Sequence, residues 1–212
     1  MRSPLVLLLL FVTALHAFAQ TPGTDQILLM NGQVLKGRVL GQSTLEIRYL
    51  DTDRKGRTRE RAEPTEGVFS VTDSLGRERI WYFHDTVFGN DLSIDQMRRF
   101  IVGEQDARSG YKPLGPVLAG FLIGAGTTVA LDLEMNAFFL PPLVGMTMIL
   151  PRVHVTKGSI SDVTMEGDEY YAYGYARVGR SKRVVRTLMS TFAGVAVGLA
   201  LRQFVIDPAL AD

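Results

Sequence analysis

The residues of this chain that could do chemistry gather in one polar stretch, residues 168–186. Tyrosines alternate there with arginines and lysines. Such a mixture occurs where aromatic rings stack on the bases of single-stranded nucleic acid, and where side chains contact lipid headgroups. Because an uncharged apolar segment follows directly, we favour lipid headgroups. The predicted membrane-interface residues are Tyr170, Tyr171, Tyr173, Tyr175, Arg180, Lys182 and Arg183.

Signatures of catalysis are missing from the sequence. His84 and His154 are the only histidines that follow the N-terminal segment, and they lie in different halves of the chain. His84 and Asp85 are potential metal ligands, but no third ligand stands at a recognisable spacing, so packing at a strand end is the favoured interpretation. No nucleophile elbow, zinc-protease motif, phosphate-binding loop or dinucleotide fingerprint occurs. We predict no enzyme activity, cofactor, metal or small-molecule substrate.

The composition excludes further classes of protein. The chain has no cysteine, which excludes disulfides, thiolate catalysis and cysteine-ligated zinc or iron–sulfur sites. Its formal net charge of +1 provides no basic field for nucleic acid. A chain of roughly 190 residues can nevertheless bury a sizeable core without disulfides.

The N-terminus has the three parts of a secretory signal peptide. Arg2 supplies the positive charge, Leu5–Leu15 the apolar core, and Ala17–Ala19 the small-residue cleavage pattern. We therefore predict that residues 1–19 are a signal peptide and that the mature chain begins at Gln20, outside the cytoplasm. No cysteine follows the apolar core, so a lipid-anchored lipoprotein is excluded.

The second half of the chain, residues 114–206, reads as a membrane-associated helical region. Residues 114–131 are uncharged and apolar, and as a helix they would span ~27 Å, close to the hydrocarbon thickness of a bilayer. A second apolar segment, 135–150, is interrupted by Pro141 and Pro142, so two short half-helices, a kinked hairpin arm or a re-entrant segment are all possible. A third apolar helix follows the tyrosine-rich stretch. The prediction is a helical hairpin plus a C-terminal helix.

Two of the apolar segments carry glycines four residues apart, a spacing that lets helix backbones approach closely in lipid. Packing of these two helices within one chain is favoured over homodimerisation. The predicted helix-packing residues are Gly120, Gly124, Gly194 and Gly198.

The charges of the loops and the signal peptide predict opposite orientations of the chain in the membrane. If the signal peptide places the first half of the chain outside, Asp132 and Glu134 move inward, while Lys112 and the basic residues 177–186 stay outside, against the positive-inside rule. Because the export of a long domain can override loop charge, we keep the periplasmic assignment. Asp132 and Glu134 are interpreted as a solvated hairpin tip rather than as an ion path.

Residues 24–86 read as a small β domain. Asn31-Gly32 is typical of a two-residue type I′ hairpin turn, and Gly37 predicts a bulge or bend within a strand. The charged run 51–66 is interpreted as a solvated hairpin tip. Short strands joined by tight turns predict a five-stranded SH3-like or Sm-like barrel. The predicted strands are Gln26–Met30, Gln33–Leu40, Thr44–Leu50, Val68–Thr72 and Glu78–Phe83.

Residues 27–39 resemble the first strands of Sm-like barrels, which have a glycine after strand one and another within strand two. The polar residues with which Sm proteins read RNA are absent, because residues 41–43 read Gly-Gln-Ser in the expected loop. The resemblance implies the fold, and we predict no nucleic-acid partner.

A helix is predicted over residues 91–110. Ser93 and Gln96 form a capping box, and Leu92 and Met97 stand at hydrophobic-staple spacing. The apolar stripe of this linker helix predicts that it packs on the β domain rather than on a membrane surface.

The residues around this helix, Phe100-Ile101, the run Gly-Glu-Gln-Asp-Ala at 103–107 and Tyr111, resemble those of a family of uncharacterised exported bacterial membrane proteins. Its members join a small N-terminal β domain to a Gly-rich hydrophobic half. The resemblance covers residues 24–201 and implies architecture only, since no activity comes with it.

Three classes of function remain for this α+β chain. The favoured one is a non-enzymatic, membrane-anchored protein of the cell envelope, whose exported β domain binds a protein partner or assembles with itself. The alternative is an oligomeric membrane component of a transport or channel assembly. An enzyme acting on lipid or cell wall is the third.

Overall fold

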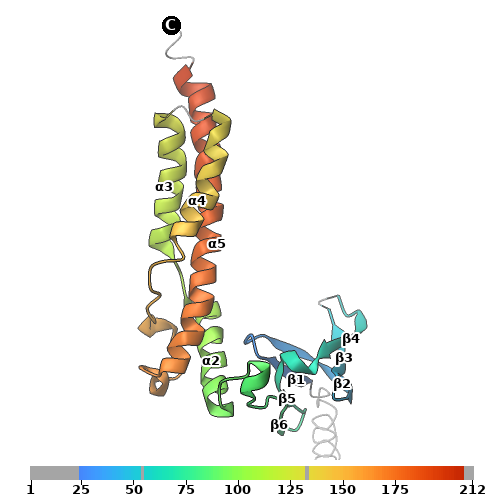
Figure 1. Cartoon of the computed structure of the whole chain (residues 1–212). Coiled ribbons are helices and arrows are strands. Elements are labelled where there is room, and N and C mark those ends of the chain that lie inside the picture. The colour runs from blue at the N-terminus through green and yellow to red at the C-terminus, as the bar shows by residue number, and fades with distance from the viewer. Residues whose placement is uncertain (1–23, 54, 132–133, 208–212) are drawn as a thin grey trace, which may run out of the picture. The chain divides into compact units, whose positions relative to one another are not determined.

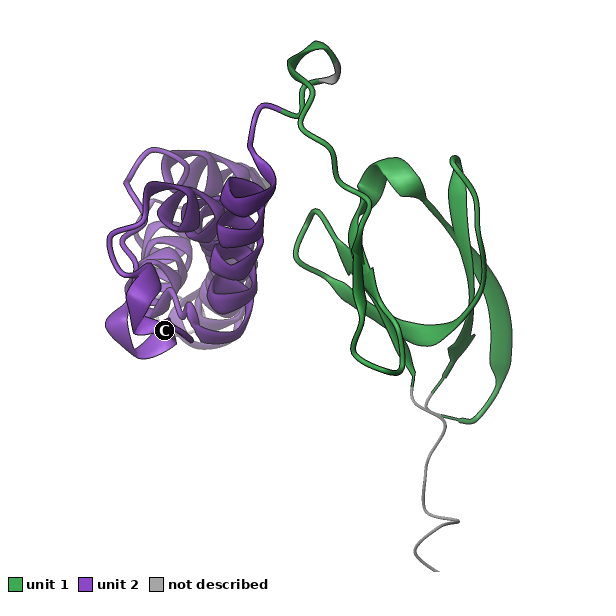
Figure 2. Ribbon diagram, turned by 90° about the horizontal axis from the view of Figure 1, so that it is seen from below, with its two compact units in different colours: residues 1–90 green, residues 91–212 purple. Residues whose placement is uncertain are grey.

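A computed structural model describes residues 24–53, 55–131 and 134–207. The chain has an α+β fold, with antiparallel strands in its first part and helices in the remainder (Figure 1). It divides into two compact units, residues 1–90 and residues 91–212 (Figure 2). The predicted signal peptide and Asp132 lie outside the described residues.

The first unit is one antiparallel sheet of six strands, where we predicted five. The order is β4-β3-β2-β1-β5-β6, so β4 and β6 are the two edges. The sheet curls strongly (Figure 2), but no ladder joins its edges within the described residues, and the predicted barrel closure is not shown. The strands are β1 (Asp25–Leu29), β2 (Val34–Gln42), β3 (Glu46–Thr52), β4 (Thr58–Pro64), β5 (Val68–Thr72) and β6 (Glu78–Ile80).

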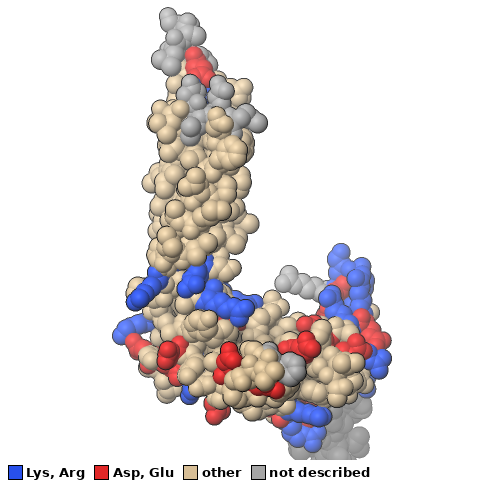
Figure 3. Space-filling model, viewed as in Figure 1, with Lys and Arg blue, Asp and Glu red and all other residues tan. Residues whose placement is uncertain are grey.

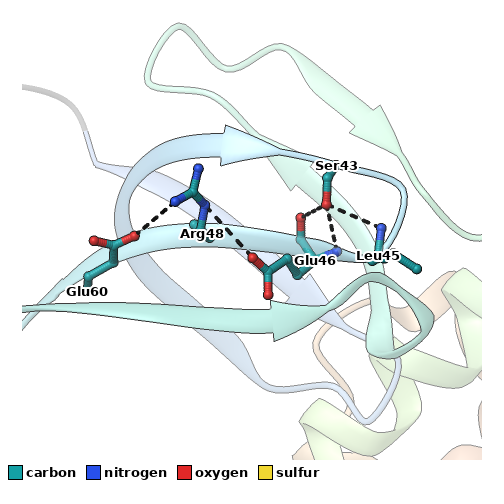
Figure 4. Close-up of polar contacts among 5 residues, drawn as sticks. All are labelled: Ser43, Leu45, Glu46, Arg48 and Glu60. Atoms are coloured by element: carbon teal, nitrogen blue, oxygen red, sulfur yellow. Dashed lines mark hydrogen bonds and ion pairs between the residues drawn. The ribbon is translucent and has the colours of Figure 1, made fainter.

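The additional strand is β4, which lies in the charged run that we interpreted as a hairpin tip. It pairs with β3 along its whole length, and nearly all of its residues are exposed. Period-2 apolar alternation could not reveal it, because neither of its faces is buried. Charged side chains instead join it to β3, with Arg61 Nε 2.9 Å from Asp51 Oδ2 and Arg48 NH1 3.5 Å from Glu60 Oε1 (Figure 4).

The β2–β3 turn contains residues 41–43 and is stabilised by hydrogen bonds of the Ser43 side chain. Ser43 Oγ accepts hydrogen bonds from the backbone N–H groups of Leu45 (3.3 Å) and Glu46 (3.0 Å), and it donates to the Glu46 carbonyl (3.0 Å) (Figure 4). This side chain is therefore used within the turn.

Two other hairpin turns share the pattern Asp-x-x-Gly-Arg, at residues 53–57 and 73–77. In each turn the aspartate accepts hydrogen bonds from backbone N–H groups two and four residues later and pairs with the arginine. These backbone bonds hold the pKa of the Asp53 and Asp73 carboxyls below the usual value. The glycines adopt φ of 74° and 80°.

The turn at Asn31-Gly32 also differs from the prediction. Leu29 N donates to the Gln33 carbonyl (2.9 Å), which leaves a three-residue loop with Gly32 at φ 78°. The loop is therefore a three-residue hairpin loop that ends in a residue with left-handed backbone conformation, rather than the predicted two-residue type I′ turn.

Gly37 marks the predicted bend of β2. Before the bend β2 pairs with β1, and after it β2 pairs with β3. A Cβ on Gly37 would lie 2.9 Å from Tyr49 Cδ2 and closer still to the Leu50 carbonyl oxygen. The bend folds the strand over the core, which consists of Ile27, Leu29, Ile47, Tyr49, Val68 and Val71, with Leu35, Val39 and Trp81 packed against it.

The second unit is helical. α4 begins at Leu140, so Pro141 and Pro142 occupy its first turn, where a missing N–H removes no intrahelical bond. A 3-10 segment, η3 (Glu134–Phe139), precedes it, so two short helical pieces occur here, the first of the three alternatives that the sequence left open. The tyrosine-rich stretch and the third apolar segment form one continuous helix. The α-helices are α2 (Ile94–Gly110), α3 (Leu114–Ala130), α4 (Leu140–Thr147) and α5 (Glu169–Leu201), and a π-helical turn, η6 (Arg202–Ile206), continues α5.

α2 begins with the predicted capping box. Ser93 N donates to Gln96 Oε1 (2.8 Å), and Gln96 N donates to Ser93 Oγ (3.3 Å). We predicted that this helix packs on the β domain. In the structure α2 belongs to the helical unit and lies against α5.

The helix Glu169–Ile206 is long and apolar enough to cross a membrane. α2 and α3 are long and apolar enough to cross a membrane only when they are taken together as one span bent by 54°.

We predict that Gly37→Ala destabilises the β unit by about 1–3 kcal/mol, because the added methyl group must displace the backbone of β3. Thermal unfolding of the full chain, followed by the fluorescence of its single tryptophan, Trp81, measures this unit selectively. Gly41→Ala is the control, since the nearest atom to its Cβ would be Arg48 NH2 at 3.6 Å. Equal midpoints for the two variants would contradict the tight bend.

Candidate functional site

The candidate site is the contact between α2 and the N-terminal half of α5, where polar side chains are buried. Two glycines bring the helix backbones together. A Cβ on Gly103 would overlap the carbonyl of Tyr171, and a Cβ on Gly174 would overlap the carbonyl of Phe100. With no side chain between the backbones, the flanking residues of both helices interdigitate.

Asp106 connects α2 to the segment that precedes α5. Its Oδ2 accepts hydrogen bonds from the Ser161 backbone N–H (2.8 Å), the Ser161 hydroxyl (2.9 Å) and the Tyr171 hydroxyl (2.8 Å). The carboxyl is 6% exposed, so its charge is stabilised by these three donors rather than by water.

Tyr175 makes a second connection beside it. Its ring is fully buried, and its hydroxyl lies 2.7 Å from Ser159 Oγ. Tyr111 meets this ring edge-on, with the centroids 6.1 Å apart. On the same helix, Gly179 leaves room for Val153, whose Cγ1 would lie 2.7 Å from a Cβ at this position.

Glu104 is the second buried acid, with 2% of its surface exposed. Its Oε1 lies 3.5 Å from Arg177 NH1 and its Oε2 lies 3.8 Å from Arg108 NH2. Both ion pairs are long. Burial therefore raises the pKa of the Glu104 carboxyl above its ordinary value of 4.5, although the two arginines act in the opposite direction.

Lys182 and Arg183 donate hydrogen bonds to backbone carbonyls at or after the C-terminal ends of other helices. Lys182 Nζ donates to the carbonyls of Ala107 (3.1 Å) and Tyr111 (3.4 Å) at the end of α2. Arg183 donates to the carbonyl of Met148 (3.0 Å) after α4, and also to that of Pro151. Cations satisfy the free carbonyls and the negative end of a helix dipole in this way.

The residues predicted at a membrane interface thus divide into two groups. Tyr171, Tyr175, Lys182 and Arg183 are engaged in the contacts above, and Tyr170 accepts a hydrogen bond from Gln96 Nε2 (2.8 Å). Tyr173 and Arg180 are exposed. Contact of these seven residues with lipid stays a prediction, and in this structure Tyr173 and Arg180 are the two most open to it.

The four predicted packing glycines all lie where α3 meets α5. A Cβ on Gly120 would lie 2.8 Å from Thr187 Cγ2, and one on Gly198 would lie 2.8 Å from the Ala125 carbonyl oxygen. Those on Gly124 and Gly194 would overlap carbonyls of the facing helix. The contact is within one chain, and Ser190 Oγ adds a hydrogen bond across it to the Val117 carbonyl (2.5 Å).

This site, which we call the polar clamp, connects α2 to α5 and to the segment before α5 through buried polar side chains. Asp106 accepts three hydrogen bonds, whereas Glu104 has two long ion pairs. Across residues 24–53, 55–131 and 134–207 no group of three or more His, Asp or Glu side chains could hold a metal ion. His84 and His154 lie in different units.

Sequence reasoning missed the burial of Asp106 and Glu104. A signal was available for Glu104, which follows Ile101 by three residues and Met97 by seven and so lies on the apolar stripe. Nothing in the sequence pointed to Ser159 or Ser161 as partners.

Comparison of the chain with protein-family models, with curated proteins and with solved structures gives no match. The geometry above is therefore the basis for a functional argument.

We predict that Gly124→Ala lowers the stability of the helical unit by about 1–3 kcal/mol relative to Gly126→Ala. Both changes raise helix propensity equally, but only position 124 faces α5, while a Cβ at position 126 meets nothing within 4 Å. Thermal unfolding of the detergent-solubilised chain, followed by helical circular dichroism, compares them. The same midpoint for both variants would mean that the α3–α5 backbone contact is incidental.

A second prediction concerns Glu104. Because its pKa is raised in the folded state, the folded chain holds the proton more tightly than the unfolded chain. The associated stability is present below pH 4.5 and is lost as the pH rises through the folded pKa. Glu104→Gln should therefore show a smaller fall in unfolding midpoint over this window than the parent chain.

The matched control is Glu169→Gln, which changes an exposed glutamate at the start of α5. It should keep the pH dependence of the parent chain. If Glu104→Gln also keeps it, the buried carboxyl does not carry this part of the pH dependence.

Proposed function

We propose that this chain is a non-enzymatic, membrane-anchored protein of the cell envelope. In this proposal α3, α4 and the C-terminal half of α5 lie in the bilayer. The β unit lies on the exported side, where it binds a protein partner or assembles with itself.

The main support for a membrane anchor is that the helix bundle has the reverse of the usual polarity, with large apolar side chains outside rather than inside. Where α3 meets α5, most of the buried residues are small or polar, with Thr128, Thr187 and Thr191 fully buried beside the glycines and Val195 the largest apolar one. The large apolar side chains point outward. More than 60% exposed are Leu118, Leu122, Phe139, Leu143, Met146, Leu150, Met189 and Phe204. Water would make such a surface costly, whereas helices in lipid pack through small residues.

The length of the uncharged part supports the same conclusion. Residues 114–131, 135–150 and 187–201 contain no Asp, Glu, Lys or Arg, and the helical unit shows a long surface without charges (Figure 3). α3 is about 26 Å long and residues 187–201 about 22 Å, which approaches the ~30 Å hydrocarbon core. Lys and Arg gather at one end of this surface (Figure 3).

The β unit offers surface for a protein partner. Its turns expose large apolar side chains, with Leu45 80% and Leu75 75% exposed, and β4 leaves one edge unpaired. The alternative, an oligomeric transport component assembled through Gly-rich helices, has less support. Gly120, Gly124, Gly194 and Gly198 are all used within one chain.

Single cysteines test the anchor cleanly because the chain has none of its own. Leu118→Cys, on the outer surface of α3, should react with a water-soluble maleimide at least tenfold more slowly in native membranes than Val163→Cys. Val163 is 76% exposed in the connection before α5. Equal rates would contradict bilayer insertion.

Leu75→Cys tests the side of the membrane. Labelling in intact cells by an impermeant maleimide supports an exported β unit, and labelling only after lysis would overturn it. A photo-crosslinker on the same cysteine should capture a partner or a second copy of the chain, and a chain that stays uncrosslinked in intact envelopes would count against the interaction role.

A further inference from the structure

A groove on the helical unit lies at the border between its charged and uncharged parts. It has a volume of about 470 Å³, within the range of ligand sites. α5 supplies one wall and Ile149, after α4, contributes to the other. The lining residues that matter here are Ile149, Tyr173, Arg177, Arg180, Val184 and Val185.

The lining changes in character along α5. The groove begins at Tyr173, carries Arg177 and Arg180 in its next turns, and ends at Val184 and Val185. From residue 177 to residue 185 the helix rises about 12 Å, in the direction of the uncharged segment 187–201. A molecule lying in the groove would thus meet two guanidinium groups at one end and aliphatic side chains at the other.

The positive charge of the groove is only partly neutralised by the protein. Arg180 is exposed and forms no ion pair within the described part of the chain. Arg177 NH1 lies 3.5 Å from Glu104 Oε1, and the Arg177 side chain is 66% exposed. The two buried acids of the unit, Glu104 and Asp106, are otherwise held by their own partners.

We propose that this groove binds an anionic phospholipid, with the phosphate at Arg177 and Arg180 and the acyl chains along Ile149, Val184 and Val185. Arginine is suited to the phosphate because its planar guanidinium donates two parallel hydrogen bonds. The aliphatic end excludes a free phosphate as the intended ligand. The inference rests on the bilayer insertion proposed above, and it adds a defined lipid site to it.

Other exposed cations lie near the same border in the sequence, including Lys112, Arg152 and Arg186. They provide the contrast between a defined site and a diffuse positive surface. Arg186 is on α5 but does not line the groove.

The test measures equilibrium binding of fluorescent phosphatidylglycerol and phosphatidylcholine to the full chain in an uncharged detergent. The parent chain should prefer phosphatidylglycerol. Arg180→Gln should weaken phosphatidylglycerol binding about fivefold and phosphatidylcholine binding by less, because the lost positive charge attracts a lipid of net negative charge more strongly than a zwitterionic one. Arg180 has no ion pair to lose, so the fold should be kept, as helical circular dichroism would show.

Two controls decide between a site and a surface. Arg186→Gln should change phosphatidylglycerol affinity by less than twofold, and an equal loss in both variants would overturn the groove. Soluble glycerol phosphate should not displace the lipid at concentrations where unlabelled phosphatidylglycerol does, and equal displacement would also overturn it.

Failure of this inference is distinguishable from failure of the proposed function. A chain that shields Leu118→Cys in membranes yet shows no preference for phosphatidylglycerol is anchored but has no lipid site. A chain that leaves Leu118→Cys fully reactive is not anchored at all.

Discussion

The helical unit depends on backbone-to-backbone contact along one helix. α5 carries glycines where α2 and α3 cross it, with Gly174 facing α2 and Gly194 and Gly198 facing α3. The partner helices place their own glycines at the same crossings. Any Cβ there would overlap a carbonyl or a neighbouring side chain, so the separation of the helices is fixed by the absence of side chains. The rest of the unit is arranged around these crossings.

The two halves of α5 use this closeness in different ways. Beside α2, it brings Asp106 within hydrogen-bond reach of Tyr171 and leaves Glu104 with almost no water. Beside α3, two buried hydroxyls donate to carbonyls of their own helices, Thr128 Oγ1 to Gly124 (2.7 Å) and Thr191 Oγ1 to Thr187 (2.8 Å). No carboxylate lies in segments 114–131 or 187–201. A single helix therefore joins a polar clamp to a contact that has no charge to desolvate, which is the division that a protein crossing from water into lipid requires.

The sequence predicts those elements whose stabilising interactions leave a local or periodic pattern of residues. The strands at 25–29 and 68–72, the capping box of α2 and the bend at Gly37 were all predictable, because alternation, capping chemistry and turn residues are local. β4 was missed because it is exposed on both faces and is held by ion pairs and backbone bonds. The polar clamp was missed for another reason. Ser159 and Ser161 meet α2 only through tertiary contact, more than fifty residues away in sequence from Asp106.

Two opposing physical effects bear on the orientation of the proposed anchor. No uncharged segment of membrane-spanning length separates the β unit from Lys112, so in this proposal the β unit and the basic end of α3 lie on the same side of the membrane. The positive-inside rule alone would put that side in the cytoplasm, since Lys112, Arg152, Arg180 and Arg186 all lie there. That rule is weak for long translocated domains, and residues 20–113, between the predicted signal peptide and α3, would form such a domain. A cation that is paired with an anionic lipid has part of its charge neutralised, so it opposes export of its segment less than a free cation does. A lipid site at Arg177 and Arg180 would therefore reduce the conflict that the sequence presents between its predicted signal peptide and its basic border.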